Sequence, residues 1–144
     1  MGLFAKEPIS RGTLVWEFVE GIDRYVSDEA MATLPHSALD FIYFYFYRSK
    51  FTGQYVFLGD NDRFTNHSYN PNVGGPDSLF PHRDGGAALR DIAAGEELTS
   101  DYSVFDADFH LYSHLYPRER EKVLVRVNRN KKTSRQAMSA RVRG

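Results

Sequence analysis

The stretch "RFTNHSYNPNV", Arg63–Val73, follows the apolar run "QYVFLG" and surrounds one histidine with asparagine, serine and proline. These residue types form turns for local reasons, because their side chains bond to nearby backbone groups or fix φ. Taken alone, an Asn-Pro-Asn run is therefore more typical of a turn than of a binding site. Whether Asn66 and His67 carry chemistry depends on which other segments of the chain join them.

The chain has 144 residues and no cysteine. A domain of this length buries about two thirds of the surface that its unfolded chain exposes, so it can hold a core without disulfides. The absence of cysteine excludes thiolate zinc sites and a cysteine nucleophile, and it favours a reducing compartment. The longest apolar block, Phe41–Tyr47, is too short to span a bilayer. We expect a cytoplasmic protein, or a nuclear one if the source is eukaryotic or viral, without membrane contact.

Charge is distributed unevenly along the chain. Residues 1–117 hold eight Lys or Arg against seventeen Asp or Glu, whereas residues 118–144 hold ten against two. We therefore expect an acidic domain, 1–117, and a basic C-terminal extension, 118–144, that is partly helical or flexible. An acidic domain attracts basic proteins or peptides and argues against a nucleic-acid surface, except on the extension. The alternative, that most carboxylates simply cover a solvated surface, stays open.

Three segments rich in β-forming residues predict strands. They are Gly12–Gly21, Gly53–Asp60 and Ala87–Ile92. In the first, Leu14, Trp16 and Phe18 alternate along one face, while Val15 and Val19 blur the pattern and suggest that both faces are buried. The clusters "GGP" and "DGG" ahead of the third segment predict turns.

Two short helices are expected between the first two strands. Ser27 is a helix N-cap followed by acidic residues, and Pro35 marks the end of that helix. Ser37 opens a second helix that runs into the aromatic block Phe41–Tyr47, although the block itself fits either a strand or a helix. The fold class is therefore mainly β with short inserted helices.

Other chemistries find little support. His110 and His114 are four residues apart, a spacing that brings two imidazoles to one helix face for zinc, but the intervening glutamate of a zincin is missing. The sequence has no glycine-rich phosphate loop and no Gly-x-Ser-x-Gly elbow. We therefore expect no metal site, no nucleoside triphosphatase and no serine hydrolase.

Three segments in order change the interpretation of Arg63–Val73. With "GLFAKEPISRGTLV" before it and "IAAGEELTSDYS" after it, the chain resembles the SET domain, a family of S-adenosylmethionine-dependent protein lysine methyltransferases, over about residues 2–105. The resemblance implies a SET-domain β-clip-like fold. It also implies that the "RFTNHS" loop and the later segment cross in a pseudoknot, which is a rare threaded arrangement.

The resemblance implies a site for S-adenosylmethionine, whose product is S-adenosylhomocysteine. Gly2 matches the second glycine of the family's Gly-x-Gly signature and is followed by Leu3 and Phe4, while the first glycine of the signature would fall before the first residue. Asn66 and His67 match the Asn-His pair that lies against the cofactor. These five residues are the expected cofactor-binding set, together with the tyrosine described next.

Tyr102 matches the family's catalytic tyrosine at the end of the Glu-Leu-x-x-Asp-Tyr signature, and it also borders the cofactor. Tyr45 is the best match to the tyrosine of the lysine channel, whereas the other aromatic residues of 41–47 are more typical of core. Methyl transfer is an in-line displacement by a neutral amine, so the enzyme has to align the reactants. It must also lower the pKa of the lysine by desolvation and by the nearby sulfonium.

Three positions depart from the family pattern. Tyr69 stands where many members carry a zinc-binding cysteine, so the chain resembles small bacterial or viral-type members without zinc and without a cysteine-rich segment after the domain. Ser100 takes the place of the aromatic residue that often limits the number of methyl groups, and Ser103 replaces a glycine. Closure of the site then falls to aromatic residues near the end of the domain: Phe105, Phe109, Tyr112 or Tyr116.

The sequence thus predicts a protein-lysine N-methyltransferase. Its expected partner is a basic protein or peptide, such as a histone-like, DNA-packaging or ribosomal protein. The alternative is a SET-like cofactor- or peptide-binding module with little or no catalytic activity. Lys131 and Lys132 of the extension are candidates for self-methylation, but a flexible tail is the more typical interpretation. The oligomeric state stays open.

Overall fold

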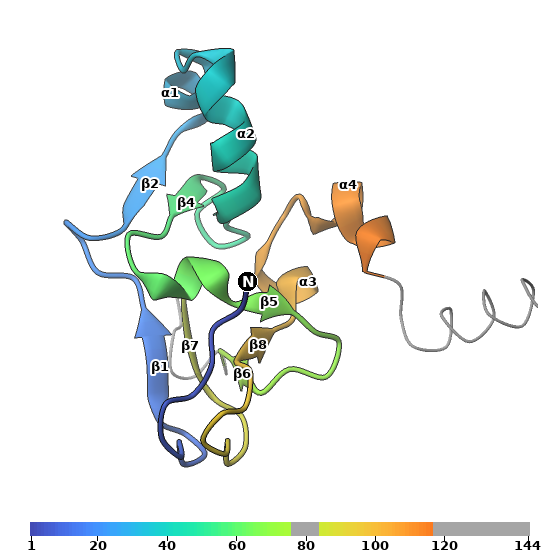
Figure 1. The fold of residues 1–144 in the computed structure, drawn as a ribbon. Coiled ribbons are helices and arrows are strands. Elements are labelled where there is room, and N and C mark those ends of the chain that lie inside the picture. Colours follow the sequence, from blue (N-terminus) through green and yellow to red (C-terminus); the bar gives the residue numbers. More distant parts are fainter. Residues whose placement is uncertain (76–83, 117–144) are drawn as a thin grey trace, which may run out of the picture. The chain divides into compact units, whose positions relative to one another are not determined.

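The computed structural model describes residues 1–75 and 84–116, and the predicted extension, 118–144, lies outside them (Figure 1). The chain divides into two compact units, Met1–Leu111 and Tyr112–Gly144. Nearly all described residues, and every strand, belong to the first unit. No helix in the described part of the chain is both long and apolar enough to cross a membrane.

The described residues form three small sheets. The first is antiparallel and has the strand order β1 (Leu14–Glu17), β7 (Gly85–Ala88), β6 (Val73–Gly74). The second is antiparallel with the order β2 (Arg24–Val26), β4 (Tyr55–Phe57), β3 (Phe46–Arg48). The third is the parallel pair β5 (Asn66–His67) and β8 (Thr99–Ser100). The prediction of a mainly β fold is confirmed.

Short helices connect the strands, and the first two lie where helices were predicted. They are α1 (Asp28–Ala32), α2 (His36–Tyr45), η1 (Asn61–Phe64), α3 (Tyr102–Phe105), α4 (Phe109–Tyr112) and η2 (Ser113–Leu115). Ser27 is the N-cap of α1, and its hydroxyl accepts the Ala30 N–H at 3.2 Å. The aromatic block adopts both of the conformations that its sequence allows, because α2 ends at Tyr45 and β3 begins at Phe46.

The first predicted strand is shorter and less regular than its pattern suggests. β1 covers only Leu14–Glu17, and its register with β7 shifts between Leu14 and Trp16. Because of that irregularity Leu14 is exposed while Trp16 is buried, so the two do not share the predicted inner face.

The "DGG" cluster is a strand rather than the predicted turn. Gly85 and Gly86 begin β7 and pair with Glu17 and Trp16 of β1. A Cβ on Gly86 would lie 3.0 Å from Val73 Cγ1, so glycine lets β6 and β7 approach closely. The strand also ends at Ala88, well before the predicted end.

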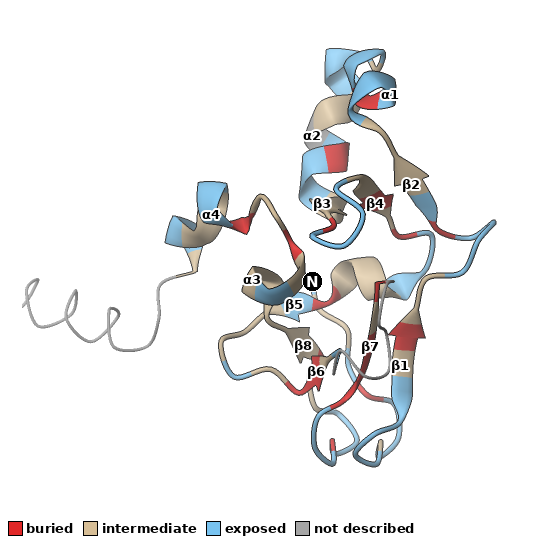
Figure 2. Ribbon diagram, turned by 180° about the vertical axis from the view of Figure 1, so that it is seen from behind, coloured by how far each residue is buried: buried red, intermediate tan, exposed pale blue. Residues whose placement is uncertain are grey.

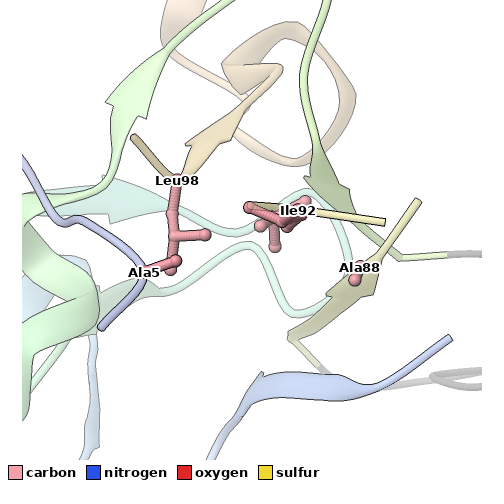
Figure 3. Close-up of a cluster of buried hydrophobic side chains, with 5 residues drawn as sticks. Ala5, Ala88, Ile92 and Leu98 are labelled. Atoms are coloured by element: carbon pink, nitrogen blue, oxygen red, sulfur yellow. The ribbon is translucent and has the colours of Figure 1, made fainter. Parts of the chain in front are cut away.

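Two buried clusters form the core, and buried residues map to both ends of the first unit (Figure 2). The first contains Ala5, Val73, Ala88, Ile92 and Leu98, and Figure 3 shows these side chains converging from separate segments. The second contains Trp16, Val56 and Leu58, with Phe18, Tyr25 and Tyr47 packed against them. The first cluster fixes the N-terminal segment against the segment that leads into β8.

Backbone pairing extends this contact. Ile9 bridges Ile92 and Phe4 bridges Glu97, both antiparallel. The Leu98 N–H donates to Leu3 O at 2.8 Å. The parallel β5–β8 pair then places the Asn-His motif beside the same segment, as the predicted crossing of the two requires. Three segments that are distant in the sequence therefore meet at one place.

Candidate active site

The N-terminal glycine lies against the Asn-His motif. Asn66 Nδ2 donates to Glu97 Oε1 at 2.6 Å and to the Met1 carbonyl at 3.0 Å. A Cβ on Gly2 would collide with the Glu97 carboxylate and come within 3.2 Å of Asn66 Nδ2. Any side chain at Gly2 would therefore displace Glu97, so this corner suits glycine.

Leu3 and Phe4, which follow Gly2, also lie along the segment that carries Glu97. Leu3 packs on the first core cluster and accepts the backbone bond from Leu98, whereas Phe4 pairs with Glu97 and leaves its side chain exposed. The structure therefore brings the predicted residues Gly2, Leu3, Phe4 and Asn66 together around Glu97, a residue that the sequence interpretation did not single out.

His67 holds Tyr102 through its ring. Its side chain is 2% exposed, and Nδ1 accepts the Tyr102 backbone N–H at 3.1 Å. An Nδ1 that accepts an N–H bond places the ring proton on Nε2. Burial lowers the pKa of His67, although the Asp101 carboxylate, 3.9 Å from Nδ1, and the Ser100 backbone oppose that shift. We take His67 to be a neutral acceptor at pH 7.

Tyr102 is fixed at both ends. It is the first residue of α3, whose N-cap Asp101 accepts the Ser103 N–H at 2.9 Å. Its hydroxyl donates to the Thr65 carbonyl at 2.6 Å. The Asp101 cap starts α3 directly after β8, so the chain turns from strand to helix at Tyr102. The cap therefore fixes the backbone of Tyr102, and the Thr65 carbonyl fixes the position of the Tyr102 hydroxyl.

Aromatic rings surround Tyr102. Its ring centroid lies 5.2 Å from that of His67, 5.7 Å from that of Phe105 and 6.2 Å from that of Phe109. Tyr69, in the position of the family's zinc-binding cysteine, packs edge-on against His67 at 4.4 Å. Phe105 and Phe109, two of the residues expected to close the site, thus contact the predicted catalytic tyrosine.

Of the remaining aromatic candidates, Tyr112 and Tyr116 belong to the second unit, where their rings lie 6.4 Å apart. Tyr45 ends α2, and its ring meets that of Phe64 edge-on at 6.0 Å. Phe64 immediately precedes Thr65, so Tyr45 and Tyr102 approach the same short segment through different contacts.

The histidines considered for zinc are divided between the two units, His110 in the first and His114 in the second. His110 Nδ1 lies 3.0 Å from the Ala107 carbonyl. Within residues 1–75 and 84–116, no group of three or more metal-ligating side chains gathers.

The third asparagine of the stretch Arg63–Val73 has a role that sequence reasoning missed. Asn72 is 2% exposed. Its Nδ2 donates to the Glu97 carbonyl at 2.8 Å, and its Oδ1 accepts the Thr99 N–H at 2.9 Å. The Asn-Pro-Asn run is therefore more than a turn, because Asn72 binds the backbone of the segment that carries Glu97. The only sequence signal was the motif itself.

A buried carboxylate, Asp84, was also missed. It is 2% exposed and accepts hydroxyl bonds from Tyr47 at 2.8 Å, Tyr25 at 3.0 Å and Ser49 at 3.0 Å. Burial, together with the Asp84 charge, raises the pKa of Tyr25 to about 12 and raises the pKa of Tyr47 well above its usual range. Tyr47 also meets Phe105 edge-on at 4.8 Å, which links this network to the rings around Tyr102.

The fold and this arrangement agree with a family comparison. The SET domain family model matches residues 1–103, so the chain belongs to the SET-domain family. The predicted family and fold are confirmed. A search of curated proteins finds no match to this chain.

The solved structures that resemble this chain include two whose descriptions bear on its family. The first is described as "ctPRC2 in an autoinhibited conformation bound to S-adenosylmethionine", with a TM-score of 0.53 and 25% identity, over 87% of this chain and 15% of that one. The second is the Neurospora SET domain protein DIM-5, a histone lysine methyltransferase, with a TM-score of 0.43 and 24% identity, over 70% of this chain and 47% of that one. The chain thus spans under half the length of each. The cofactor expected from the sequence is the one bound in the first structure.

Proposed function

We propose that this protein is an S-adenosylmethionine-dependent protein-lysine N-methyltransferase. Membership of the SET-domain family supports the proposal in general terms. The observation that carries it here is the parallel pairing of β5 with β8, because it joins Asn66 and His67 to the segment that ends in Tyr102. We propose residues 1–117 as the catalytic domain and 118–144 as a basic extension. Because the sequence contains no cysteine, we place the protein in a reducing compartment, the cytoplasm or the nucleus.

The proposed cofactor-binding residues are Gly2, Leu3, Phe4, Asn66 and His67, with Tyr102 at the border. Their chemistry fits an amino-acid sulfonium, because Asn66 and the Glu97 carboxylate that it contacts offer polar groups for the charged ends of the cofactor. When bound, S-adenosylmethionine supplies an electrophilic methyl group on a positive sulfur.

Tyr102 is the proposed catalytic residue. Its hydroxyl donates a hydrogen bond to the Thr65 carbonyl, and the role proposed for its oxygen is to accept a hydrogen bond from an incoming amine. Phe105 and Phe109 form an apolar environment that disfavours an ammonium and lowers the pKa of a bound lysine. Alignment and desolvation then supply most of the rate acceleration. We place Tyr45 along the aliphatic stem of the lysine.

The proposed substrate is a basic protein or peptide, such as a histone-like, DNA-packaging or ribosomal protein. The excess of carboxylates over Lys and Arg in residues 1–117 supports this class, because it attracts positive charge over a distance.

Transfer of tritium from labelled S-adenosylmethionine to a pool of basic proteins tests the proposal. We expect labelling by the wild type and a loss of at least about a hundredfold in Tyr102→Phe, on the scale of one positioned catalytic group. Tyr43→Phe is the matched control, because Tyr43 is exposed on α2, and it should label normally. Cofactor binding without any labelling would instead support a binding module, and the methyltransferase proposal would fail.

A further inference from the structure

A short chain of hydrogen bonds leads from Tyr102 to a carboxylate, Asp62. The Tyr102 hydroxyl donates to the Thr65 carbonyl at 2.6 Å. Thr65 in turn donates twice to Asp62, from its backbone N–H to the Asp62 carbonyl at 2.8 Å and from its hydroxyl to Asp62 Oδ1 at 2.9 Å. Because Thr65 is buried and bound on both sides, the direction of its carbonyl depends on Asp62.

Asp62 is not needed to begin its own helix. It lies in η1, whose N-cap is Asp60, and the Asp60 carboxylate already accepts the Asp62 N–H at 2.9 Å. The side chain of Asp62 therefore serves some other purpose than capping.

The surroundings of Asp62 disfavour its charge. Burial raises the pKa of Asp62 to about 6, the Asp60 and Asp23 carboxylates push it in the same direction, and only the Thr65 hydroxyl bond lowers it. The Asp62 charge in turn helps to raise the pKa of Tyr47. Among the described residues no Lys, Arg or His forms an ion pair with Asp62. Asp62 is half-buried, and a partly desolvated carboxylate without an ion pair among these residues reduces stability, which favours a functional reason for its presence.

We propose that Asp62 is a positioning residue for Tyr102, and that its ionised carboxylate holds Thr65 in the orientation in which the Thr65 carbonyl binds the Tyr102 hydroxyl. A hydrogen bond to a charged acceptor is roughly twice as strong as one to a neutral acceptor. Protonation of Asp62 therefore loosens Thr65, and with it the end of the catalytic side chain. The effect on methyl transfer rests on the proposed function, whereas the structural coupling does not.

The coupling is measured without catalysis by labelling tyrosine with ¹³C at Cζ and recording its NMR signals from pH 4.5 to 8.5. Tyr102→Phe assigns the Tyr102 signal. In the wild type this signal should shift with a midpoint near pH 6, and in Asp62→Asn it should not shift over this range. We call this pH-dependent shift of the Tyr102 signal the Tyr102 step. Thr65→Ser keeps the hydroxyl and should keep the step, whereas Thr65→Val should lose it.

Asp60→Asn is the matched control. Asparagine is as good an N-cap as aspartate, so η1 should stay intact while one neighbouring negative charge disappears. The Tyr102 step should persist in this variant, with its midpoint at lower pH, because the Asp60 charge is one of the causes that raise the pKa of Asp62. A wild-type signal without the step, or a step that survives in Asp62→Asn, would overturn the coupling.

Methyl transfer provides the second readout, as the ratio of wild-type to Asp62→Asn single-turnover rates at each pH. This ratio cancels the ionisation of the substrate lysine. We expect a ratio of about five above pH 7, the worth of one strengthened hydrogen bond, falling towards one below pH 5.5. A ratio that does not vary with pH would overturn the positioning role while leaving the methyltransferase intact. A Tyr102 step in a protein that transfers no methyl group would leave the coupling standing and refute the proposed function.

Discussion

Two carboxylates of this molecule, Asp84 and Asp62, differ in exposure and in hydrogen bonding, because Asp84 is 2% exposed whereas Asp62 is half-buried. Asp84 accepts bonds from three hydroxyls, those of Tyr25, Tyr47 and Ser49. Asp62 accepts a single hydroxyl bond among the described residues, from Thr65, and two other carboxylates raise its pKa. Hydrogen bonds from the protein therefore compensate the charge of Asp84 more fully than the charge of Asp62.

The difference separates a structural carboxylate from one that can respond to pH. Tyr25 comes from β2, Tyr47 from β3, and Ser49 follows β3, so Asp84 ties the second sheet to the start of β7. Breaking this network leaves several buried groups without partners, whereas neutralising Asp62 removes a charge that the fold tolerates poorly. Substitutions at the two sites should therefore change stability in opposite directions.

The largest effect is expected for Asp84→Ala. It leaves two tyrosine hydroxyls and one serine hydroxyl without their acceptor, at a cost of about 3–5 kcal/mol in the free energy of unfolding. Urea denaturation at pH 7 measures it. Asp91→Ala is the control, because the exposed Asp91 accepts a single backbone bond, from Arg11, and its loss should cost about 1 kcal/mol or less. Equal losses of stability in the two variants would show that Asp84 does not hold the second sheet to the start of β7.

Alkaline pH tests the same network from the side of its donors. The pKa of Tyr25 is about 12 in the folded protein and about 10 in the unfolded chain, so the folded state keeps a proton that the unfolded state loses. The resulting stability is complete below pH 10 and decreases as the pH rises towards 12. We expect the free energy of unfolding to fall by about 1.4 kcal/mol per pH unit from this residue, and Tyr25→Phe to remove that part of the slope. An unchanged slope in Tyr25→Phe would contradict the assignment.

Asp62→Asn should stabilise the protein. The pKa of Asp62 is raised to about 6, so between about pH 4 and pH 6 the folded state binds more protons than the unfolded state, and the wild type loses stability as the pH rises through this window. Asparagine removes the charge and keeps an acceptor for Thr65. We expect a gain of about 1–3 kcal/mol at pH 7.5 that disappears near pH 4, measured by thermal or urea unfolding at both pH values. A variant less stable than the wild type at pH 7.5 would break the comparison with Asp84.

The sequence named residues that the fold brings together in the candidate site, but it did not reveal the hydrogen-bond networks behind them. Asn66, His67 and Tyr102 belong to short contiguous motifs, so the family resemblance identified them, and the fold brings them together. Asp84 lies next to two glycines, and its partners are distant in the sequence, so no local pattern distinguishes it from a turn residue. Burial of a charge depends on which segments fold over it, and that information is spread over the whole chain.

The same reason explains the errors in the strands. Alternation predicted that Leu14 faces inward with Trp16, but the register shift between them depends on the partner strand β7. The glycines of "DGG" were assigned to a turn because of their backbone freedom, whereas the close approach of Val73 to Gly86 requires glycine within a strand. Local propensity shows that glycine suits a turn, but tertiary contacts decide whether a given glycine lies in a turn or in a closely packed strand.

The smallest effect, and the sharpest link between the two carboxylates, is expected for Thr65→Val. It deletes the one contact that lowers the pKa of Asp62, so the midpoint of the Asp62 titration should rise above 6 by an amount on the order of half a unit to one unit, the worth of one hydrogen bond. ¹³Cγ-labelled aspartate measures this midpoint, and Thr65→Ser should leave it in place. Ser49→Ala is the parallel change at Asp84, because it removes one hydroxyl donor and leaves those of Tyr25 and Tyr47. If Thr65→Val lowers the midpoint of Asp62 or leaves it unchanged, the hydroxyl does not stabilise this charge, and the chain from Asp62 to Tyr102 loses its first link.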